Sequence, residues 1–264
     1  MGSSPIYPVA IIAQLVEQGI SNAQVGSSSL FDGILSKYNM KIFLDTADCQ
    51  EIQKHYSTGL IDGVTTNPSL ILKSHRKPDD VYSELKAMGL YDISMEVVDN
   101  TVIGMLNEAH RLVELFGEVT TIKVPCTPDG LRVCHELAKE GIRVNVTLIF
   151  SQAQAILAVK AGATYVSPFV GRVDDNSFGG LCLVRDISKV FREHMVRTQV
   201  LAASLRGVRD VGRAFEYGAD IVTMPTTVFE KMYKHILTDK GLELFDHDYQ
   251  STLEYLSNEN QSVV

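Results

Sequence analysis

The chain has 264 residues, of which 45% are hydrophobic and 21% charged, and its formal net charge is −8. This acidic balance argues against a nucleic-acid partner, which needs a basic footprint, but it leaves room for a small anionic substrate held by one or two arginines. No apolar run is long enough to cross a bilayer and no secretory signal is evident, so the sequence predicts no membrane partner and a cytoplasmic location.

The first 39 residues differ in texture from the rest and contain a single basic residue, Lys37. Serine and glycine clusters divide them into two short apolar pieces, for which we predict helices at Val9 to Gln18 and Leu30 to Lys37. Regular alternation starts at Met40, which is itself a candidate start residue. Residues 1–39 are therefore predicted to be an N-terminal extension to which the sequence assigns no role, and residues 40–264 a single catalytic domain.

After Met40, short β-rich runs alternate with helix-like stretches. Strands are predicted at Lys41–Leu44, Gly63–Thr66, Asp92–Val97, Val119–Val124, Arg143–Leu148, Thr164–Pro168, Gln199–Ala203 and Asp220–Met224. Helices are predicted at Ala47–Tyr56, Asp79–Met88, Val102–Phe116, Asp129–Glu140, Ser151–Ala161, Ile187–Met195, Val208–Tyr217, Thr226–His235 and, in the tail, Leu242–Leu256. Such β/α units favour the α/β class and a single (β/α)8 TIM barrel over an open doubly wound sheet, and no GxGxxG follows the first strand.

Polar side chains gather at the carboxyl ends of the predicted strands. Because side chains alternate along a strand, Lys123 shares a face with Thr121, and Glu96 shares one with Ser94. In a barrel these ends meet at one mouth, where barrel active sites are built. The polar residues predicted to line this mouth are Asp45, Asn67, Glu96, Lys123, Asn145, Thr147, Ser167 and Ser204.

Of these residues, Lys123 says the most about the type of reaction. A lysine within an apolar strand loses hydration, which favours the neutral, nucleophilic amine that a Schiff-base mechanism needs. The alternatives are a snorkelling side chain or a buried partner of Glu96. Asp45 has the alternative of being only a helix cap, and Asn67, before Pro68, that of being only a turn residue.

Arginines follow the sixth and seventh strands, close to where barrels bind phosphate. Arg172 lies in the loop after the sixth strand, and Ser204 and Arg206, after the seventh, are candidates for a phosphate site. Arg143 and Arg197 are predicted to be solvated instead. The seven histidines and four cysteines show no metal-binding spacing, so the sequence predicts no metal site and no cofactor.

Six segments, in this order and at compatible spacing, resemble the transaldolase family, and in particular its compact members, which include fructose-6-phosphate aldolases. The segments are Phe43–Ala47, Gly63–Ser69, Ile122–Pro125, Asn145–Thr147, Ser167–Arg172 and Ala203–Arg206. The resemblance runs from about Met40 to the region of Met224. It implies the barrel fold and sugar-phosphate substrates, in the carbohydrate metabolism of the pentose phosphate pathway.

The resemblance also implies roles for residues. Lys123 would form the Schiff base, Asp45 would take the proton of the substrate C4 hydroxyl, and Glu96 would shuttle protons through a water shared with Thr147. Substrate hydroxyls or the enamine would be bound by Asn67, Asn145 and Ser167, and phosphate by Arg172, Ser204 and Arg206. The implied reaction moves a dihydroxyacetone unit from fructose 6-phosphate or sedoheptulose 7-phosphate to an aldose phosphate.

Two positions favour transfer over simple cleavage. Glu96 resembles transaldolases, where fructose-6-phosphate aldolases have Gln, and Phe150 stands where those aldolases place a Tyr that could help release dihydroxyacetone. The alternatives are a fructose-6-phosphate aldolase and a non-catalytic sugar-phosphate-binding barrel, although a binding protein has no need of Lys123. Since compact relatives tend to be ring-shaped, we expect a homo-oligomer.

Overall fold

The computed structural model describes residues 40–261 of the chain, with the side chains of residues 40–256. The helices predicted at Val9 to Gln18 and Leu30 to Lys37 lie outside the described residues. Every predicted strand is present and lies within one residue of its expected bounds. The strands are β1 (Lys41–Asp45), β2 (Gly63–Thr65), β3 (Ile93–Glu96), β4 (Thr120–Pro125), β5 (Val144–Ile149), β6 (Tyr165–Pro168), β7 (Gln199–Ala202) and β8 (Ile221–Met224).

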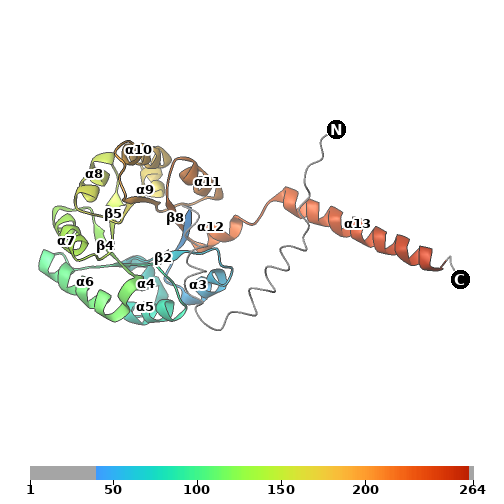
Figure 1. The fold of residues 1–264 in the computed structure, drawn as a ribbon, viewed down its shortest axis with the longest axis horizontal. Helices are drawn as coiled ribbons and strands as arrows, with labels where there is room; N and C mark the ends of the chain where they lie inside the picture. The colour runs from blue at the N-terminus through green and yellow to red at the C-terminus, as the bar shows by residue number, and fades with distance from the viewer. Residues whose placement is uncertain (1–39, 262–264) are drawn as a thin grey trace, which may run out of the picture. The chain divides into compact units, whose positions relative to one another are not determined.

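Helices connect these strands, and hydroxyl side chains start several of them. Thr101, Thr127 and Ser151 accept hydrogen bonds from the first turns of α6, α7 and α8. With the labels of Figure 1, the helices are α3 (Cys49–Tyr56), α4 (Pro68–Ser74), α5 (Pro78–Ala87), α6 (Val102–Phe116), the 3₁₀ turn η1 (Gly117–Val119), α7 (Pro128–Lys139), α8 (Gln152–Lys160), α9 (Val170–Asp175), α10 (Gly180–Glu193), α11 (Val208–Glu216), α12 (Thr226–Lys231) and α13 (Ile236–Gln261).

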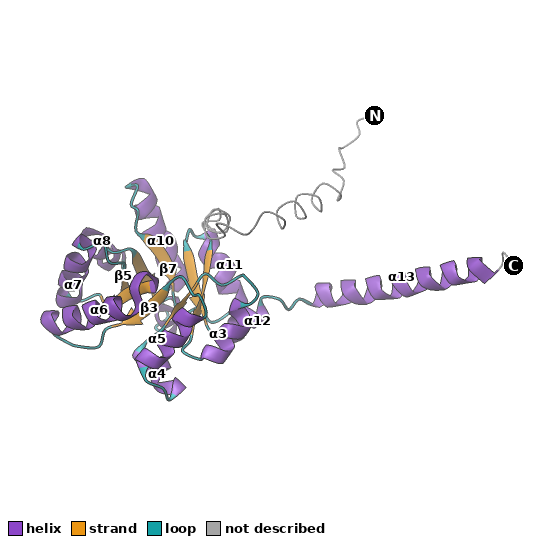
Figure 2. Cartoon of the chain, turned by 60° about the horizontal axis from the view of Figure 1, so that its bottom comes forward, coloured by secondary structure: helices purple, strands orange, loops and turns teal. Residues whose placement is uncertain are grey.

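The eight strands close into a barrel in chain order. All pairs are parallel, and β1 pairs with both β2 and β8. Helices surround the strands, as Figures 1 and 2 show. The prediction of a (β/α)8 barrel is therefore confirmed. Among the described helices, none is both long and apolar enough to cross a membrane.

Two hydrophobic cores hold the barrel. The larger one lies between the strands and the helices, and the smaller one includes Phe43, Tyr165, Leu201 and Ile221. Phe43 and Tyr165 meet edge to face with their ring centroids 6.5 Å apart. A Cβ at Gly63 would lie 2.7 Å from the Phe43 ring, so this packing requires glycine. This second cluster fills the barrel interior below the polar mouth.

A buried carboxylate ties together the amino-terminal ends of several strands. Asp92 accepts hydrogen bonds from Thr121 Oγ1 at 2.7 Å, Tyr165 OH at 2.6 Å and Arg143 Nη1 at 2.9 Å. The prediction that Arg143 is merely solvated is therefore wrong. Its guanidinium also donates to the Glu118 carbonyl oxygen at 2.5 Å. Because the buried charge of Asp92 has these partners, this end of the barrel is structural.

Some helices depart from the prediction. No helix is predicted at α4 or α9, and α10 begins at Gly180 instead of Ile187. A helix of six or seven residues shows too little amphipathic period to be recognised, and its position depends on contacts with distant segments. The tail helix is present but longer than predicted, beginning at Ile236.

Candidate active site

Lys123 lies near the middle of β4 and is only 4% exposed. Its neighbours Ile122 and Val124 belong to the larger core between the strands and the helices, so the lysine side chain points into the barrel. Nζ donates a hydrogen bond to the Thr66 carbonyl oxygen at 2.9 Å and lies 2.9 Å from Glu96 Oε2. The snorkelling alternative is therefore wrong. The lysine is the buried partner of Glu96, which places a proton acceptor directly on the amine.

The register of three adjacent strands sets this arrangement. Glu96 of β3 is the Cα partner of Lys123, which in turn is the partner of Asn145 of β5. Asn145 Nδ2 donates to Ser94 Oγ at 3.2 Å, and Ser167 Oγ donates to Asn145 Oδ1 at 2.7 Å. These bonds fix the orientation of the Asn145 amide and leave one of its two N–H donors for a ligand.

Asp45 ends β1 and faces the same cavity as Lys123. Its Oδ1 accepts a hydrogen bond from Thr65 Oγ1 at 2.9 Å, and Thr223 Oγ1 lies 2.7 Å from Thr65 Oγ1. Burial raises the pKa of the Asp45 carboxyl, while the Lys123 charge and the Thr65 hydrogen bond partly offset this shift. The helix cap of α3 is Asp48, so the capping alternative for Asp45 is wrong.

Two further predicted residues have distinct surroundings. Asn67 caps α4, since its Oδ1 accepts from the Leu70 amide at 3.0 Å, and its side chain also lines the Lys123 cavity. Asn67 is thus a helix cap instead of only a turn residue, and its place on the cavity wall is compatible with a substrate contact. Thr147 Oγ1 is buried and has no hydrogen-bond partner within the part of the chain that the structure describes. This hydroxyl is available to a water molecule or a ligand.

A cavity of about 90 Å³ opens onto Lys123. Of the predicted residues, its wall includes Asp45, Asn67, Lys123, Ser167, Arg172 and Ser204. Thr65, Thr223 and Phe169 also line this wall and were not among the predicted site residues. Thr223 was accessible to the same alternation argument, because it shares a face of β8 with the interior residue Ile221.

Arg172 and Ser204 come together because α9 packs closely on the loop after β7. The Val170 amide donates to the Ala203 carbonyl oxygen at 3.0 Å, and the Gly171 amide to the Ser204 carbonyl oxygen at 3.1 Å. A Cβ at Gly171 would lie 2.4 Å from that Ser204 oxygen, so only glycine allows this approach. Ser204 itself has a φ of 61°, and strain of this kind occurs at functional sites.

Arg206 lies at the rim and does not line the cavity. Both of its terminal nitrogens donate to the two carboxylate oxygens of Asp175, and this bidentate pair holds the pKa of Asp175 below its ordinary value. The structure therefore places Arg206 near Ser204 but already engaged. Asp175 was not among the predicted site residues.

Phe150 does not line the Lys123 cavity. Its side chain is 43% exposed, and its ring meets the Phe169 ring edge to face at 5.9 Å. Phe150 lines a neighbouring cavity of about 600 Å³ that shares Arg172 with the Lys123 cavity. Position 150 therefore reaches the central cavity through Phe169.

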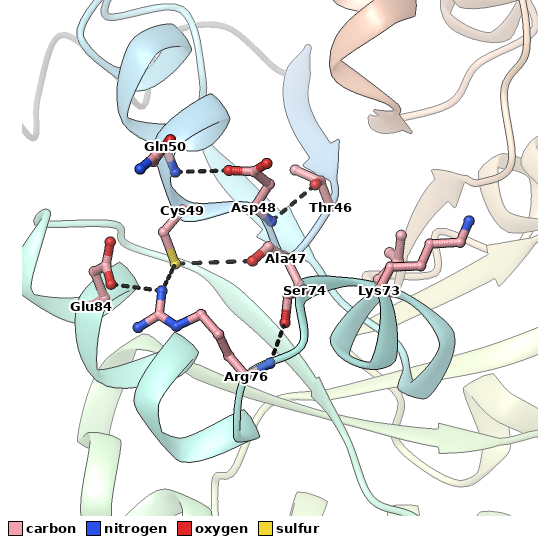
Figure 3. A pocket seen from close by; sticks show the side chains of 10 residues that line it. Thr46, Ala47, Asp48, Cys49, Gln50, Lys73, Ser74, Arg76 and Glu84 are labelled. Atoms are coloured by element: carbon pink, nitrogen blue, oxygen red, sulfur yellow. Dashed lines mark hydrogen bonds and ion pairs between the residues drawn. The ribbon is translucent and has the colours of Figure 1, made fainter.

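A cavity of about 560 Å³ lies beside the start of α3, next to α4 and α5 (Figure 3). Arg76 crosses it, with Nη1 3.3 Å from Cys49 Sγ and 2.8 Å from Glu84 Oε2. None of the predicted site residues lines this cavity. Lys123 and its partners therefore define the candidate active site.

Comparison with known proteins adds to this geometry. The family model described as "Transaldolase/Fructose-6-phosphate aldolase" matches residues 42–263. A "Probable transaldolase" of Nitrosopumilus maritimus (strain SCM1) is 47% identical over 212 residues, which is 80% of this chain and 95% of the relative. Relatives with the same description from Geobacter sulfurreducens and Caulobacter vibrioides are 48% and 49% identical, over 80% and 81% of this chain and 99% and 98% of their own lengths.

Proposed function

The chain belongs to the transaldolase/fructose-6-phosphate aldolase family, and we propose that it is a transaldolase working through a Schiff base on Lys123. It moves a dihydroxyacetone unit from fructose 6-phosphate or sedoheptulose 7-phosphate to an aldose phosphate. The observation that carries this proposal is the buried Lys123 amine, 2.9 Å from Glu96, at the barrel mouth. Burial of the amine beside a carboxylate supports nucleophilic attack on a ketose carbonyl.

The proposed reaction assigns one task to each buried group. The Lys123 amine adds to C2 of the ketose, and Glu96 with a water held by Thr147 moves the protons that allow loss of water from the carbinolamine. The Asp45 carboxylate then takes the C4 hydroxyl proton. The C3–C4 bond breaks, its electron pair passes into the iminium, and an enamine remains on Lys123 while the aldehyde leaves.

The second half of the reaction reverses these steps with a new aldehyde. C3 of the enamine attacks the aldehyde carbon, and Asp45 returns its proton to the new oxygen. Water then hydrolyses the iminium and frees the Lys123 amine. In this proposal Asn67, Asn145 and Ser167 hold hydroxyl groups, whereas Arg172, Ser204 and Arg206 hold the phosphate.

A second candidate, fructose-6-phosphate aldolase, would hydrolyse the enamine before an acceptor arrives. The phenyl ring of Phe150 argues against it, because that ring has no proton to donate and packs on Phe169 beside the cavity. A non-catalytic sugar-phosphate-binding barrel is the third candidate. Ligand-induced stabilisation without turnover would favour it.

We further propose a homo-oligomer and a cytoplasmic location. Helix α13 carries exposed apolar side chains at helical spacing, Leu242, Phe245, Tyr249 and Leu253, which suit a contact with a second copy. All four cysteines are free thiols, as suits a reducing compartment. The family match from residue 42 supports a catalytic domain that begins near Met40.

The test of the proposed chemistry is a borohydride trap. The protein is incubated with fructose 6-phosphate and reduced, and the added mass is located by peptide mapping. We expect the adduct on Lys123, no adduct in Lys123→Met, and an unchanged adduct in Lys73→Met, which alters an exposed lysine of α4. A folded protein that turns over substrate with no adduct on Lys123 would sink the Schiff-base mechanism.

A further inference from the structure

The last helix of the barrel packs against the first. Helix α3 follows β1 and α12 follows β8, and these two strands pair where the barrel closes. Figures 1 and 2 both show the two helices side by side. Lys54 of α3 reaches Glu230 of α12, with Nζ 2.6 Å from Oε1. Side chains from both helices therefore meet over this seam.

A buried imidazole faces two carboxylates at this seam. Glu51 and His55 lie one turn apart on α3, and His55 is 5% exposed. Among the described residues His55 Nε2 has no hydrogen-bond partner, although Glu51 Oε2 lies 3.5 Å away and Glu230 Oε1 lies 3.6 Å away. A buried polar atom without a partner is uncommon, so the geometry calls for a further group between these three side chains.

We propose that Glu51, His55 and Glu230 form a binding site for one divalent zinc-class cation. An imidazole nitrogen and two carboxylate oxygens are ligands that Zn²⁺ accepts, with water completing a tetrahedron. Zn²⁺ bonds of about 2.0–2.2 Å set neighbouring ligand atoms roughly 3.3–3.6 Å apart. The two distances from Nε2 match this spacing, and all three ligand atoms lie within 4.8 Å of one another.

Lys54 decides how tightly such an ion is held. Its ammonium group donates a hydrogen bond to Glu230 Oε1, the same oxygen that faces His55. Lys54 is 58% exposed, so it can move into solvent when a cation takes its place. The ion and Lys54 therefore compete for Glu230, and removing the lysine charge should tighten metal binding.

The ion would bridge the helices on either side of the β1–β8 seam. An ion that binds only the folded chain stabilises it by mass action. The site uses none of the residues of the Lys123 cavity. This inference therefore stands independently of the proposed reaction, and we expect turnover to be insensitive to a chelator.

The direct test is a competition titration of the full chain with Zn²⁺ and a chromophoric chelator. We expect one equivalent to bind, with affinity at least about tenfold weaker in Glu51→Gln and in Glu230→Gln. Both replaced carboxylates are partly exposed, so these variants should fold without the metal. Lys54→Gln should bind several-fold more tightly. At about a hundredfold excess over Kd, Zn²⁺ should raise Tm by roughly 5–10 °C in the wild type.

The matched control is Glu140→Gln. Glu140 pairs with His110 at 2.8 Å, and no third ligand completes that pair among the described residues. This variant should bind Zn²⁺ as the wild type does. Binding that is absent from the wild type, or that survives unchanged in Glu51→Gln and Glu230→Gln, would overturn the proposal.

Discussion

Glu96 and Lys123 are register partners on adjacent strands, and Glu96 Oε2 lies 2.9 Å from Lys123 Nζ. The backbone ladder between β3 and β4 thus sets the separation of the two groups. A carboxylate at this position can accept protons from the amine and return them. The two groups should consequently act as a unit.

Glu96→Gln should remove the proton acceptor beside Lys123 while leaving the amine buried. The amide keeps the size of the side chain but cannot accept a proton, so turnover should fall by roughly 10²-fold or more. The rate of borohydride trapping with fructose 6-phosphate should fall with it, because formation of the iminium is slowed. Glu84→Gln is the control and should keep full activity, because Glu84 of α5 pairs with Arg76 and does not line the Lys123 cavity. A normal trapping rate in Glu96→Gln would show that another group moves these protons.

Asp45→Asn should lower turnover and raise stability at neutral pH. Burial raises the pKa of Asp45 above its ordinary value of 3.8, so the folded state disfavours the charged carboxylate. The cost of this charge is present above the folded pKa and disappears as the pH falls below the ordinary value. The Tm of the variant should therefore exceed that of the wild type at pH 7 and converge with it near pH 3.5.

The control for that variant is Asp48→Asn. Asp48 caps α3 through its side chain, and Asn caps a helix equally well, so neither stability nor activity should change appreciably. Equal Tm differences for Asp45→Asn at pH 7 and at low pH would contradict the assigned cause. Thermal melts at a series of pH values measure both variants.

Asp175→Asn should strengthen phosphate binding. Asp175 holds both terminal nitrogens of Arg206, and because exposed ion pairs are weak, freeing the arginine should improve affinity by at most about fivefold. KM for fructose 6-phosphate should fall by at most about fivefold, while kcat stays the same. Asp174→Asn is the control, since Asp174 accepts from the Gly180 amide and Asn can do the same. A raised KM would mean that Asp175 positions Arg206 instead of competing for it.

Phe150→Tyr should increase release of free dihydroxyacetone in the absence of an acceptor. The new hydroxyl would stand beside Phe169, close enough to the cavity to help protonate the enamine. Phe178→Tyr adds the same hydroxyl to the same outer cavity at a 73% exposed position and should change nothing. An unchanged release in Phe150→Tyr would remove the role given to position 150.

Tyr165→Phe should destabilise the barrel without affecting catalysis by the folded protein. The variant removes a buried hydroxyl that donates to Asp92 at 2.6 Å, and hydrogen bonds to charged groups contribute about 1.5–3 kcal/mol. Tm should fall by roughly 3–12 °C. Tyr233→Phe, at a 54% exposed position, should leave Tm unchanged. A loss of kcat in proportion to the loss of Tm would show that the hydrogen bonds around Asp92 also hold the active-site residues in position.

Strands and chemical groups could be predicted because both follow local rules. Alternation along β4 is enough to point Lys123 inward. Barrel active sites lie at the carboxyl ends of the strands, so residues at the ends of different strands can be assigned to one site. Helices α4 and α9 could not be predicted, because their few residues carry no clear period. Their positions depend on contacts such as those of Val170 and Gly171 with the loop after β7.

Contacts between residues far apart in the sequence could not be predicted. Arg143 and Asp92 are 51 positions apart, and Arg206 and Asp175 are 31 apart. Nothing periodic links such residues, since they meet only after the barrel has closed. The same holds for Glu230 and His55, which lie on different helices and meet only across the β1–β8 seam.

The close packing of α9 on the loop after β7 separates two tasks within one barrel. The amine and its proton carriers stand on strands that the backbone ladder fixes, whereas Arg172 and Ser204 stand on connecting segments joined to each other through Gly171. Connecting segments tolerate change more readily than strands do. Exchanging this pair of segments as one module should therefore redirect the preference for chain length and phosphate position while preserving the reactive amine.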